Sequence, residues 1–283
     1  MWWLIAAIPL ILALLLLWLT APNHACARAR SWRGQLFAHR GLHDETKAEN
    51  TLAAFEAACA AGYGIELDVR FSKDGQLVVF HDDDLQRMCG DPRRPEQLTY
   101  AELQTLPLKG TGERIPGFDE VLRLVDGRAP LLVEIKSCRA IYALTDAVVA
   151  RLRAYSGPYI VESFNPLSLL RLRRIAPEII RGQLVASRED TARETGRLQA
   201  VALSGLLTNA LSRPDFVAYN IVDVSSPAPR LQRHLYHTPM ACWTVRGPTQ
   251  LKKALKRGDM VIFERIRPET GRDEDLLYRT NKQ

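Results

Sequence analysis

Eight short apolar runs, separated by stretches with helical character, are the feature that most limits what this chain can fold into. Strands that alternate with helices favour a parallel sheet. Eight such strands, without a Gly-x-Gly-x-x-Gly segment after the first, favour a closed barrel over a doubly wound sheet, and about 250 residues is the usual size of an α/β barrel. We therefore predict a (β/α)8 TIM barrel with strands at 35–39, 64–70, 131–135, 159–163, 179–185, 216–219, 241–245 and 260–264, and helices that include 51–61, 146–154 and 166–175.

One break in the alternation predicts an addition to the barrel. Asp74 and Gly75 form a tight-turn signal between two β-rich segments, so a β-hairpin rather than a helix should follow the second strand. This hairpin would bring His81 to the ends of the strands. Residues 91–117, rich in proline, glycine and charge, are expected to form an excursion with one short helix at 99–106.

Acidic side chains at alternate positions of buried strands indicate a functional site. Glu66 and Asp68 lie two residues apart in IELDV, and Glu134 and Lys136 lie two apart in LLVEIK. Residues i and i+2 of a strand point to the same face, and burying an unpaired carboxylate is very costly. Catalytic groups of α/β barrels lie at the C-terminal ends of strands. A metal ion and an anionic substrate would account for these charges.

The balance of charges favours one divalent cation. Glu66, Asp68 and Glu134 sum to −3, whereas Arg40 and Lys136 supply +2, so the side chains alone would repel an anion. One divalent ion reverses the net sign, and each charge pair at ~5 Å contributes about 3 kcal/mol at an effective dielectric constant near 20. Ligands that are all oxygen atoms point to Mg²⁺ or Ca²⁺ rather than Zn²⁺, and the choice between the two stays open.

Five motifs in a fixed order carry a resemblance to a known family. They read HRG, ENT, ELD, HD after a DG turn, and EIK, within a region that runs from about residue 35 to residue 268. Any one of them alone is weak, but the ordered set resembles the signature of the glycerophosphodiester phosphodiesterase family. The motifs are His39-Arg40-Gly41, Glu49-Asn50-Thr51, Glu66-Leu67-Asp68, His81-Asp82 and Glu134-Ile135-Lys136.

The resemblance implies roles for individual side chains. His39 and His81 would transfer protons, one to deprotonate the nucleophile and one to protonate the leaving alkoxide, in an order that the sequence leaves open. In the family, the glycerol hydroxyl next to the phosphate serves as an internal nucleophile, and water then opens the cyclic phosphate. The other implied roles are metal ligands (Glu66, Asp68, Glu134), contacts to phosphoryl oxygens (Arg40, Lys136), orientation of these groups (Glu49, Asn50), and packing against the glycerol or alcohol (Trp243, Phe164).

The resemblance to the family is weaker at two aromatic residues and at the end of the last predicted strand. Trp243 and Phe164 are equally well explained as ordinary barrel-filling aromatics, because strands favour such residues. The last predicted strand reads VIFERIRPE, where many family members have a Thr-Asp-Arg-Pro type of ending. Glu264 replaces that polar pair, which bears on substrate preference rather than on the reaction.

The implied activity is the hydrolysis of glycerophosphodiesters to glycerol 3-phosphate and an alcohol. A second reading is a lysophospholipase D that acts on lysophospholipids or N-acylethanolamine lipids. A third, non-enzymatic reading is a degenerate barrel that binds phosphorylated metabolites, and it would be expected to lose one or more motifs. The net charge of +6 is too small for a nucleic-acid-binding protein, and nothing in the sequence indicates a protein partner.

The first 22 residues are predicted to form a membrane anchor. About 20 uncharged residues suffice to cross a hydrocarbon core ~30 Å thick, and tryptophans near both ends suit the interfaces. Arginines at 28, 30 and 33 follow, so the positive-inside rule places the catalytic domain in the cytoplasm, where an odd number of cysteines also fits. A cleaved signal peptide is the alternative. The expected organisation is an anchor at 1–22, a basic linker at 23–34, a barrel at 35–270 and a polar tail at 271–283.

Overall fold

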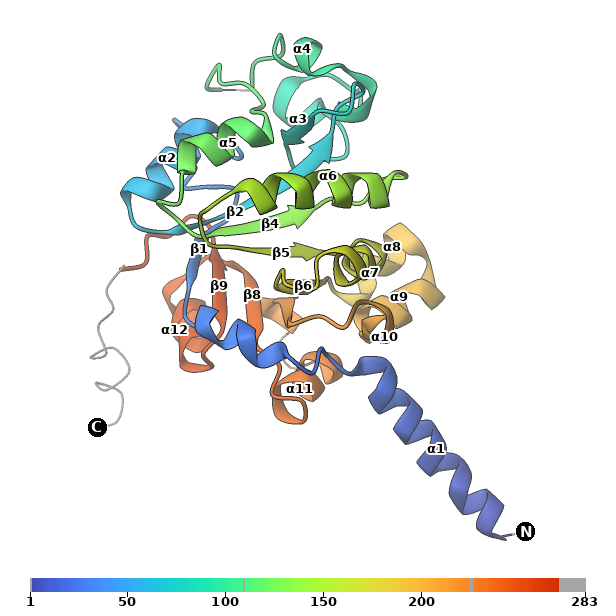
Figure 1. The fold of residues 1–283 in the computed structure, drawn as a ribbon. Coiled ribbons are helices and arrows are strands. Elements are labelled where there is room, and N and C mark those ends of the chain that lie inside the picture. Colours follow the sequence, from blue (N-terminus) through green and yellow to red (C-terminus); the bar gives the residue numbers. More distant parts are fainter. Residues whose placement is uncertain (1, 109, 224–225, 270–283) are drawn as a thin grey trace, which may run out of the picture. The chain divides into compact units, whose positions relative to one another are not determined.

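The computed structural model describes residues 2–108, 110–223 and 226–269, in which eight parallel strands close into a barrel (Figure 1). The strand order is β1-β9-β8-β7-β6-β5-β4-β2, and a pairing of β1 with β2 completes the ring. The predicted TIM barrel is therefore confirmed, with a strand at each predicted position. The strands are β1 (Leu36–Ala38), β2 (Gly64–Phe71), β3 (Leu77–Val79), β4 (Leu131–Ile135), β5 (Tyr159–Ser163), β6 (Arg181–Val185), β7 (Phe216–Asn220), β8 (Met240–Val245) and β9 (Met260–Phe263).

Helices connect the strands of the barrel. The 3₁₀ helices are η1 (Cys26–Trp32), η2 (Pro95–Gln97) and η3 (Ile221–Asp223). The α-helices are α1 (Trp2–Thr20), α2 (Leu52–Ala60), α3 (Gln86–Cys89), α4 (Tyr100–Leu103), α5 (Phe118–Val125), α6 (Ile141–Ala154), α7 (Pro166–Ile175), α8 (Arg188–Thr195), α9 (Arg197–Ser204), α10 (Asn209–Ser212), α11 (Pro227–His234) and α12 (Pro248–Lys256). Thr51 caps the N-terminus of α2, because its hydroxyl accepts a hydrogen bond from the backbone N–H of Ala54 at 3.3 Å.

The predicted hairpin after the second strand is present. β2 and β3 pair antiparallel, with Val69 opposite Val79, and Gly75 in the turn has a φ of 75° that favours glycine. The excursion that follows contains η2 and α4, and α4 is shorter than the helix predicted at 99–106. An apolar cluster that includes Val78, Phe80 and Leu103 packs the hairpin against the excursion. The hairpin thus has a small core of its own.

The chain forms two compact units. One consists of the residues up to Trp32 together with 133–153 and 160–241, and it contains the parallel run β5–β6–β7. The other consists of 33–132, 154–159 and the described residues from 242 to 269, and it contains β1 paired with both β2 and β9. The predicted polar tail at 271–283 lies outside the described residues.

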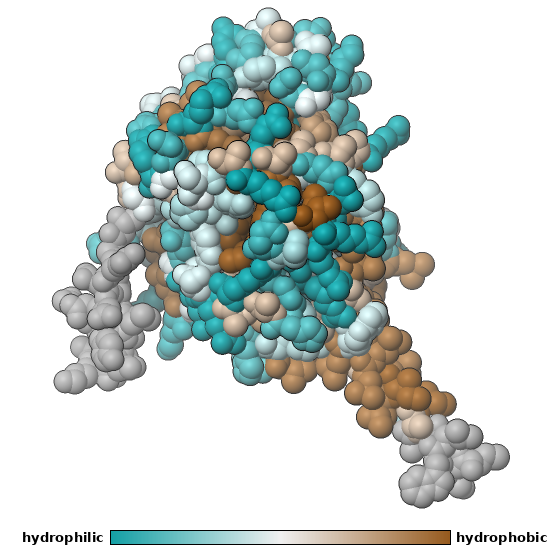
Figure 2. Space-filling view, viewed as in Figure 1, coloured by the Kyte–Doolittle hydropathy of each residue, from teal (hydrophilic) through white to brown (hydrophobic). Residues whose placement is uncertain are grey.

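The predicted membrane anchor is wrong. Within the residues that the structure describes, no helix combines the length and the apolar character needed to cross a membrane. Most apolar side chains of α1 between Ile8 and Trp18 are exposed (Figure 2), but the last turn of the helix is bound to other parts of the chain. Arg213 donates to Trp18 O at 2.9 Å and Asn209 to Thr20 O at 3.0 Å. The part before that turn, residues 2–16, rises about 22 Å, less than the ~30 Å of a hydrocarbon core.

The basic segment after α1 is a structural element, and this removes the argument for cytoplasmic orientation. Arg28 donates two hydrogen bonds to the fully buried Asp215, at 3.0 and 2.7 Å, and one to the carbonyl oxygen of Pro177 at 2.8 Å. Asn23 also donates to Asp215, at 2.7 Å. An arginine committed to such contacts says nothing about which side of a membrane its flank faces, so the predicted membrane location is corrected together with the anchor.

Candidate active site

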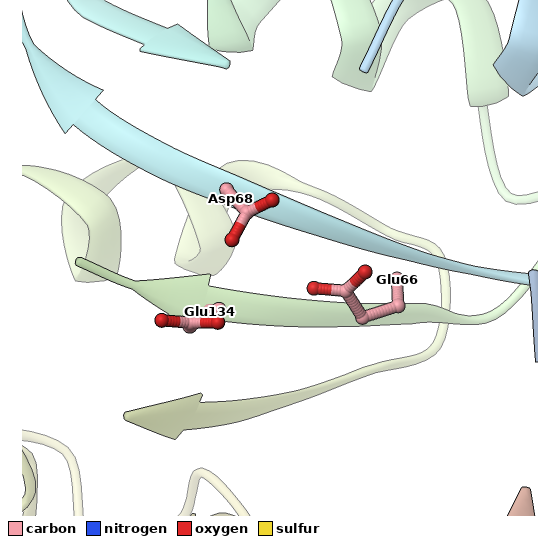
Figure 3. Close-up of side chains that lie close together, drawn as sticks. All are labelled: Glu66, Asp68 and Glu134. Atoms are coloured by element: carbon pink, nitrogen blue, oxygen red, sulfur yellow. The ribbon is translucent and has the colours of Figure 1, made fainter. Parts of the chain in front are cut away.

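Three buried carboxylates lie together in the structure (Figure 3). One oxygen atom from each of Glu66, Asp68 and Glu134 lies within 4.8 Å of the others. Glu66 and Asp68 leave the same face of β2, as their spacing of two residues predicts, and Glu134 comes from β4. Oxygen atoms at this separation can share one hard cation. Their assignment as metal ligands stays a prediction.

His39, which directly follows β1, lies between Glu66 of β2 and Glu264, which directly follows β9. Ala38 of β1 pairs with Ile65 of β2, so the next residue of each strand, His39 and Glu66, stand opposite each other. The Nε2 atom of His39 is 4.0 Å from a Glu66 oxygen. Burial lowers the pKa of His39 to about 4, although nearby carboxylates act in the opposite direction. At neutral pH the imidazole is therefore uncharged and has one nitrogen lone pair that can accept a proton.

Arg40 links the first two motifs to the carboxylate cluster. It adopts a left-handed conformation, with φ of 56°, and its backbone N–H donates to a Glu66 oxygen at 2.8 Å. Its guanidinium donates to Glu49 at 2.7 Å and approaches Asp68 to 3.7 Å. Burial would lower the pKa of Arg40, but the charges of Asp68 and Glu49 outweigh it and raise this pKa. Arg40 is thus a permanently charged group beside the cluster.

Asn50 supports the fit of a cation to this site. Its side-chain N–H donates to Asp68 at 2.8 Å, which fixes the orientation of the amide. The amide oxygen, Oδ1, is buried and has no hydrogen-bond donor among the residues that the structure describes. A buried acceptor without a donor is costly, and a metal ion or a metal-bound water would satisfy it. The donor set of three carboxylates and a nearby amide oxygen fits Mg²⁺ or Ca²⁺.

A chain of ion pairs connects the two motifs that contain histidine. His81 Nδ1 lies 2.7 Å from Asp82, and Arg87 donates to both oxygens of Asp82, at 2.6 and 3.0 Å. The same guanidinium donates to both oxygens of Glu49, at 3.0 and 2.6 Å. Glu49 in turn accepts from Arg40. The side chains that the sequence places in separate motifs are therefore held in one network.

The other predicted site residues lie on or directly after the strands β4, β5 and β8. Lys136 pairs with Glu134 at 2.9 Å, and both side chains are about nine-tenths buried. Phe164 directly follows β5 and Trp243 lies within β8, each partly exposed. Their roles beside a substrate stay predictions.

Three residues of the site were not predicted. Arg87 lies outside the motifs, and its contacts to Glu49 and Asp82 join residues far apart in sequence. Glu264 follows β9 and contacts His39 Nδ1 at 3.3 Å, while Arg246 after β8 donates to Glu264 at 2.8 Å. The only sequence signal was the unusual acid at position 264.

Comparison with known proteins identifies the family. The sequence profile of the Glycerophosphoryl diester phosphodiesterase family matches residues 39–266, which include all five motifs. The chain belongs to this family. A glycerophosphodiester phosphodiesterase of Caldanaerobacter subterraneus is 35% identical over 160 residues, which cover 53% of this chain and 65% of that protein. Three bacterial curated relatives are matched over 63% to 65% of their own length.

Two further relatives differ in how much of their own length this chain matches. An Oleispira antarctica phosphodiesterase, solved in complex with the product sn-glycerol-3-phosphate, superposes with a TM-score of 0.65 at 25% identity and covers 83% of this chain and 94% of its own. A lysophospholipase D of Rattus norvegicus is 35% identical over 111 residues, 35% of each chain. The solved relative therefore matches nearly its whole length, and the lysophospholipase D only about a third.

Proposed function

We propose that this family member is a divalent-cation-dependent phosphodiesterase that hydrolyses glycerophosphodiesters to glycerol 3-phosphate and an alcohol. The observation that carries the proposal is the cluster of Glu66, Asp68 and Glu134, whose oxygens lie within 4.8 Å of one another, with His39 Nε2 at 4.0 Å from Glu66. The glycerol 3-phosphate bound as a product in a solved relative supports this substrate class.

In this proposal, Glu66, Asp68 and Glu134 hold one Mg²⁺ or Ca²⁺, with Asn50 beside them. The bound cation supplies positive charge that attracts the phosphodiester and stabilises negative charge developing on its oxygens. Arg40 and Lys136 donate hydrogen bonds to phosphoryl oxygens, and Glu49 orients Arg40. Trp243 and Phe164 pack against the glycerol or the alcohol.

His39 and His81 act as general base and general acid. One accepts the proton of a glycerol hydroxyl next to the phosphate, and that oxygen attacks phosphorus, which releases the alcohol and forms a cyclic phosphate. The other histidine donates a proton to the leaving alkoxide, and water then opens the ring with the roles reversed. The neutral state of buried His39 suits the base.

Product analysis tests this function. Purified full-length protein is incubated with glycerophosphocholine, glycerophosphoethanolamine and glycerophosphoglycerol, with Mg²⁺ or Ca²⁺ and with excess chelator, and the products are separated by ³¹P NMR. The proposal expects glycerol 3-phosphate and the free alcohol only when the cation is present. Release of a phosphorylated alcohol and free glycerol would contradict it, because the other ester bond would then have been cleaved.

A lysophospholipase D remains the second candidate, favoured by the 35% identity to the rat enzyme over a third of each chain. Turnover of lysophosphatidylcholine in the absence of glycerophosphocholine turnover would establish it in place of the first. The non-enzymatic reading, a barrel that only binds phosphorylated metabolites, predicts binding of glycerol 3-phosphate by calorimetry with no turnover of any diester.

A further inference from the structure

Glu264 occupies a defined position relative to His39 because both residues follow paired strands. Ala38 of β1 pairs with Phe263 of β9, so the next residues, His39 and Glu264, stand opposite each other. The backbone N–H of His39 donates to Phe263 O at 2.9 Å, and that of Glu264 donates to Val245 O at 3.0 Å. β1 thus carries His39 between β2 on one side and β9 on the other, with an acid on each side.

The two ring nitrogens of His39 face different acids. Nδ1 lies 3.3 Å from Glu264 Oε2, whereas Nε2 lies 4.0 Å from Glu66 Oε2, on the side of the carboxylate cluster. An ionised carboxylate can only accept a hydrogen bond, and a neutral imidazole carries its single N–H on one nitrogen. A hydrogen bond to Glu264 therefore requires the N–H on Nδ1 and leaves the lone pair on Nε2.

Glu264 is itself held in place. Its Oε2 accepts from Arg246 at 2.8 Å, and its Oε1 lies 3.2 Å from Arg265 Nε. Its side chain is only 9% exposed. The hydrogen bond with His39, opposed by burial and helped by Arg246, keeps the pKa of Glu264 well below its usual range. Glu264 is therefore a charged acceptor at any pH at which the protein would work.

We propose that Glu264 is a positioning residue that fixes the ring orientation and the Nδ1–H tautomer of His39, so that Nε2 faces the reacting atoms as the proton acceptor. The inference rests on the proposed role of His39 and deepens it. A carboxylate that accepts a hydrogen bond from one ring nitrogen fixes the tautomer and orientation of a catalytic histidine. Around histidines that ligate a metal, loss of such a partner costs about 10- to 100-fold.

Glu264→Gln tests the proposal, because glutamine keeps the size but its amide can donate to Nδ1 and so permits the other tautomer. We expect kcat to fall about 10- to 100-fold with KM within twofold of wild type, and Glu264→Asp to recover part of the loss. Glu269→Gln is the matched control, since it removes an exposed acid five residues away, and it should keep wild-type kinetics. A kcat within twofold of wild type in folded Glu264→Gln, or a loss confined to KM, overturns the proposal.

NMR detection of the protonated ring nitrogen of His39 in the wild-type protein tests the proposal even if Glu264→Gln does not fold. Long-range ¹H–¹⁵N spectra of the full-length wild-type protein, with the His39 signal assigned by its loss in His39→Asn, should show a proton on Nδ1. A proton on Nε2 in the wild-type protein overturns the proposal without any activity measurement. His39→Ala distinguishes the role of His39 from that of Glu264. Retained turnover in His39→Ala removes the proposed role of His39. If His39→Ala loses turnover while Glu264→Gln keeps wild-type kinetics, only the role of Glu264 is removed.

Discussion

Replacing Arg87 by alanine should reduce turnover without unfolding the protein. The Arg87 guanidinium makes two hydrogen bonds to Glu49 and two to Asp82, so it joins the residue that orients Arg40 to the residue that contacts His81. In Arg87→Ala, Glu49 keeps its contact with Arg40 and Asp82 keeps its contact with His81. Arg87→Ala therefore removes the link between Glu49 and Asp82 and leaves the contacts within each motif in place.

The size of the effect follows from geometry and exposure. The Arg87 side chain is 49% exposed, so each of its two bidentate pairs is screened by water and is worth about 0.5 to 1 kcal/mol. If the total of about 1 to 2 kcal/mol holds His81 and Arg40 in the reactive geometry, its loss lowers kcat roughly 5- to 30-fold. Arg87→Lys should restore little, because an ammonium group cannot form both bidentate pairs.

Arg93→Ala is the matched control for this variant. Arg93 lies in the excursion that follows α3, its side chain is 52% exposed, and it makes a bidentate pair with Asp91, which is not a residue of the site. Steady-state kinetics with glycerophosphocholine, together with thermal unfolding of each variant, measures both effects. Equal kcat in Arg87→Ala and Arg93→Ala would refute the view that the link between the motifs positions the site.

The other predictions concern the histidines, the N-terminal segment and pH. His39→Ala and His81→Ala should each lower kcat by ~10²–10⁴ with unchanged circular dichroism; normal turnover in either would remove that residue from the mechanism. Arg28→Ala should lower stability by about 2 kcal/mol, or roughly 4 °C in Tm, because buried Asp215 then keeps, among the described residues, its contacts with Arg181 and Asn23. Arg30 is exposed, so Arg30→Ala should leave Tm unchanged; equal Tm values in the two variants would count against this prediction. Because the pKa of Glu264 is lower in the folded protein than in the unfolded chain, ionised Glu264 stabilises the fold above its unfolded pKa of about 4.3. This contribution is lost as the pH falls through the folded pKa, so the Tm difference between wild type and Glu264→Gln should shrink below about pH 4. A Tm difference that grows below pH 4 would contradict this prediction.

The strands and the acidic cluster were predictable from the sequence because both depend on local periodicity. The spacing of Glu66 and Asp68 sets their common face whatever the rest of the chain does. The DG turn similarly predicts the hairpin that ends near His81. The contacts of Glu264 and Arg87 depend instead on strand register and loop path: His39 and Glu264 are 225 residues apart in sequence, and no periodicity relates them.

The error at the N-terminus has the same physical origin. Apolar composition over 1–22 describes a helix but not what its last turn touches, and the contacts from Asn209 and Arg213 are long-range. The arginine that served as a topological marker, Arg28, is instead the partner of buried Asp215. Hydropathy and flanking charge depend on composition alone, so they could not predict the tertiary contacts of α1 and Arg28.

The most direct test of the account is the dependence of turnover on free cation in wild type and in Glu134→Gln. Activity on glycerophosphocholine is measured in metal-stripped protein titrated with Mg²⁺ or Ca²⁺, and cation binding is measured in parallel by calorimetry. The three-carboxylate site predicts no turnover without the cation, saturable recovery in wild type, and both weaker binding and turnover reduced by orders of magnitude in Glu134→Gln, while Glu269→Gln behaves as wild type. Full turnover of the stripped wild-type protein in excess chelator would contradict the account.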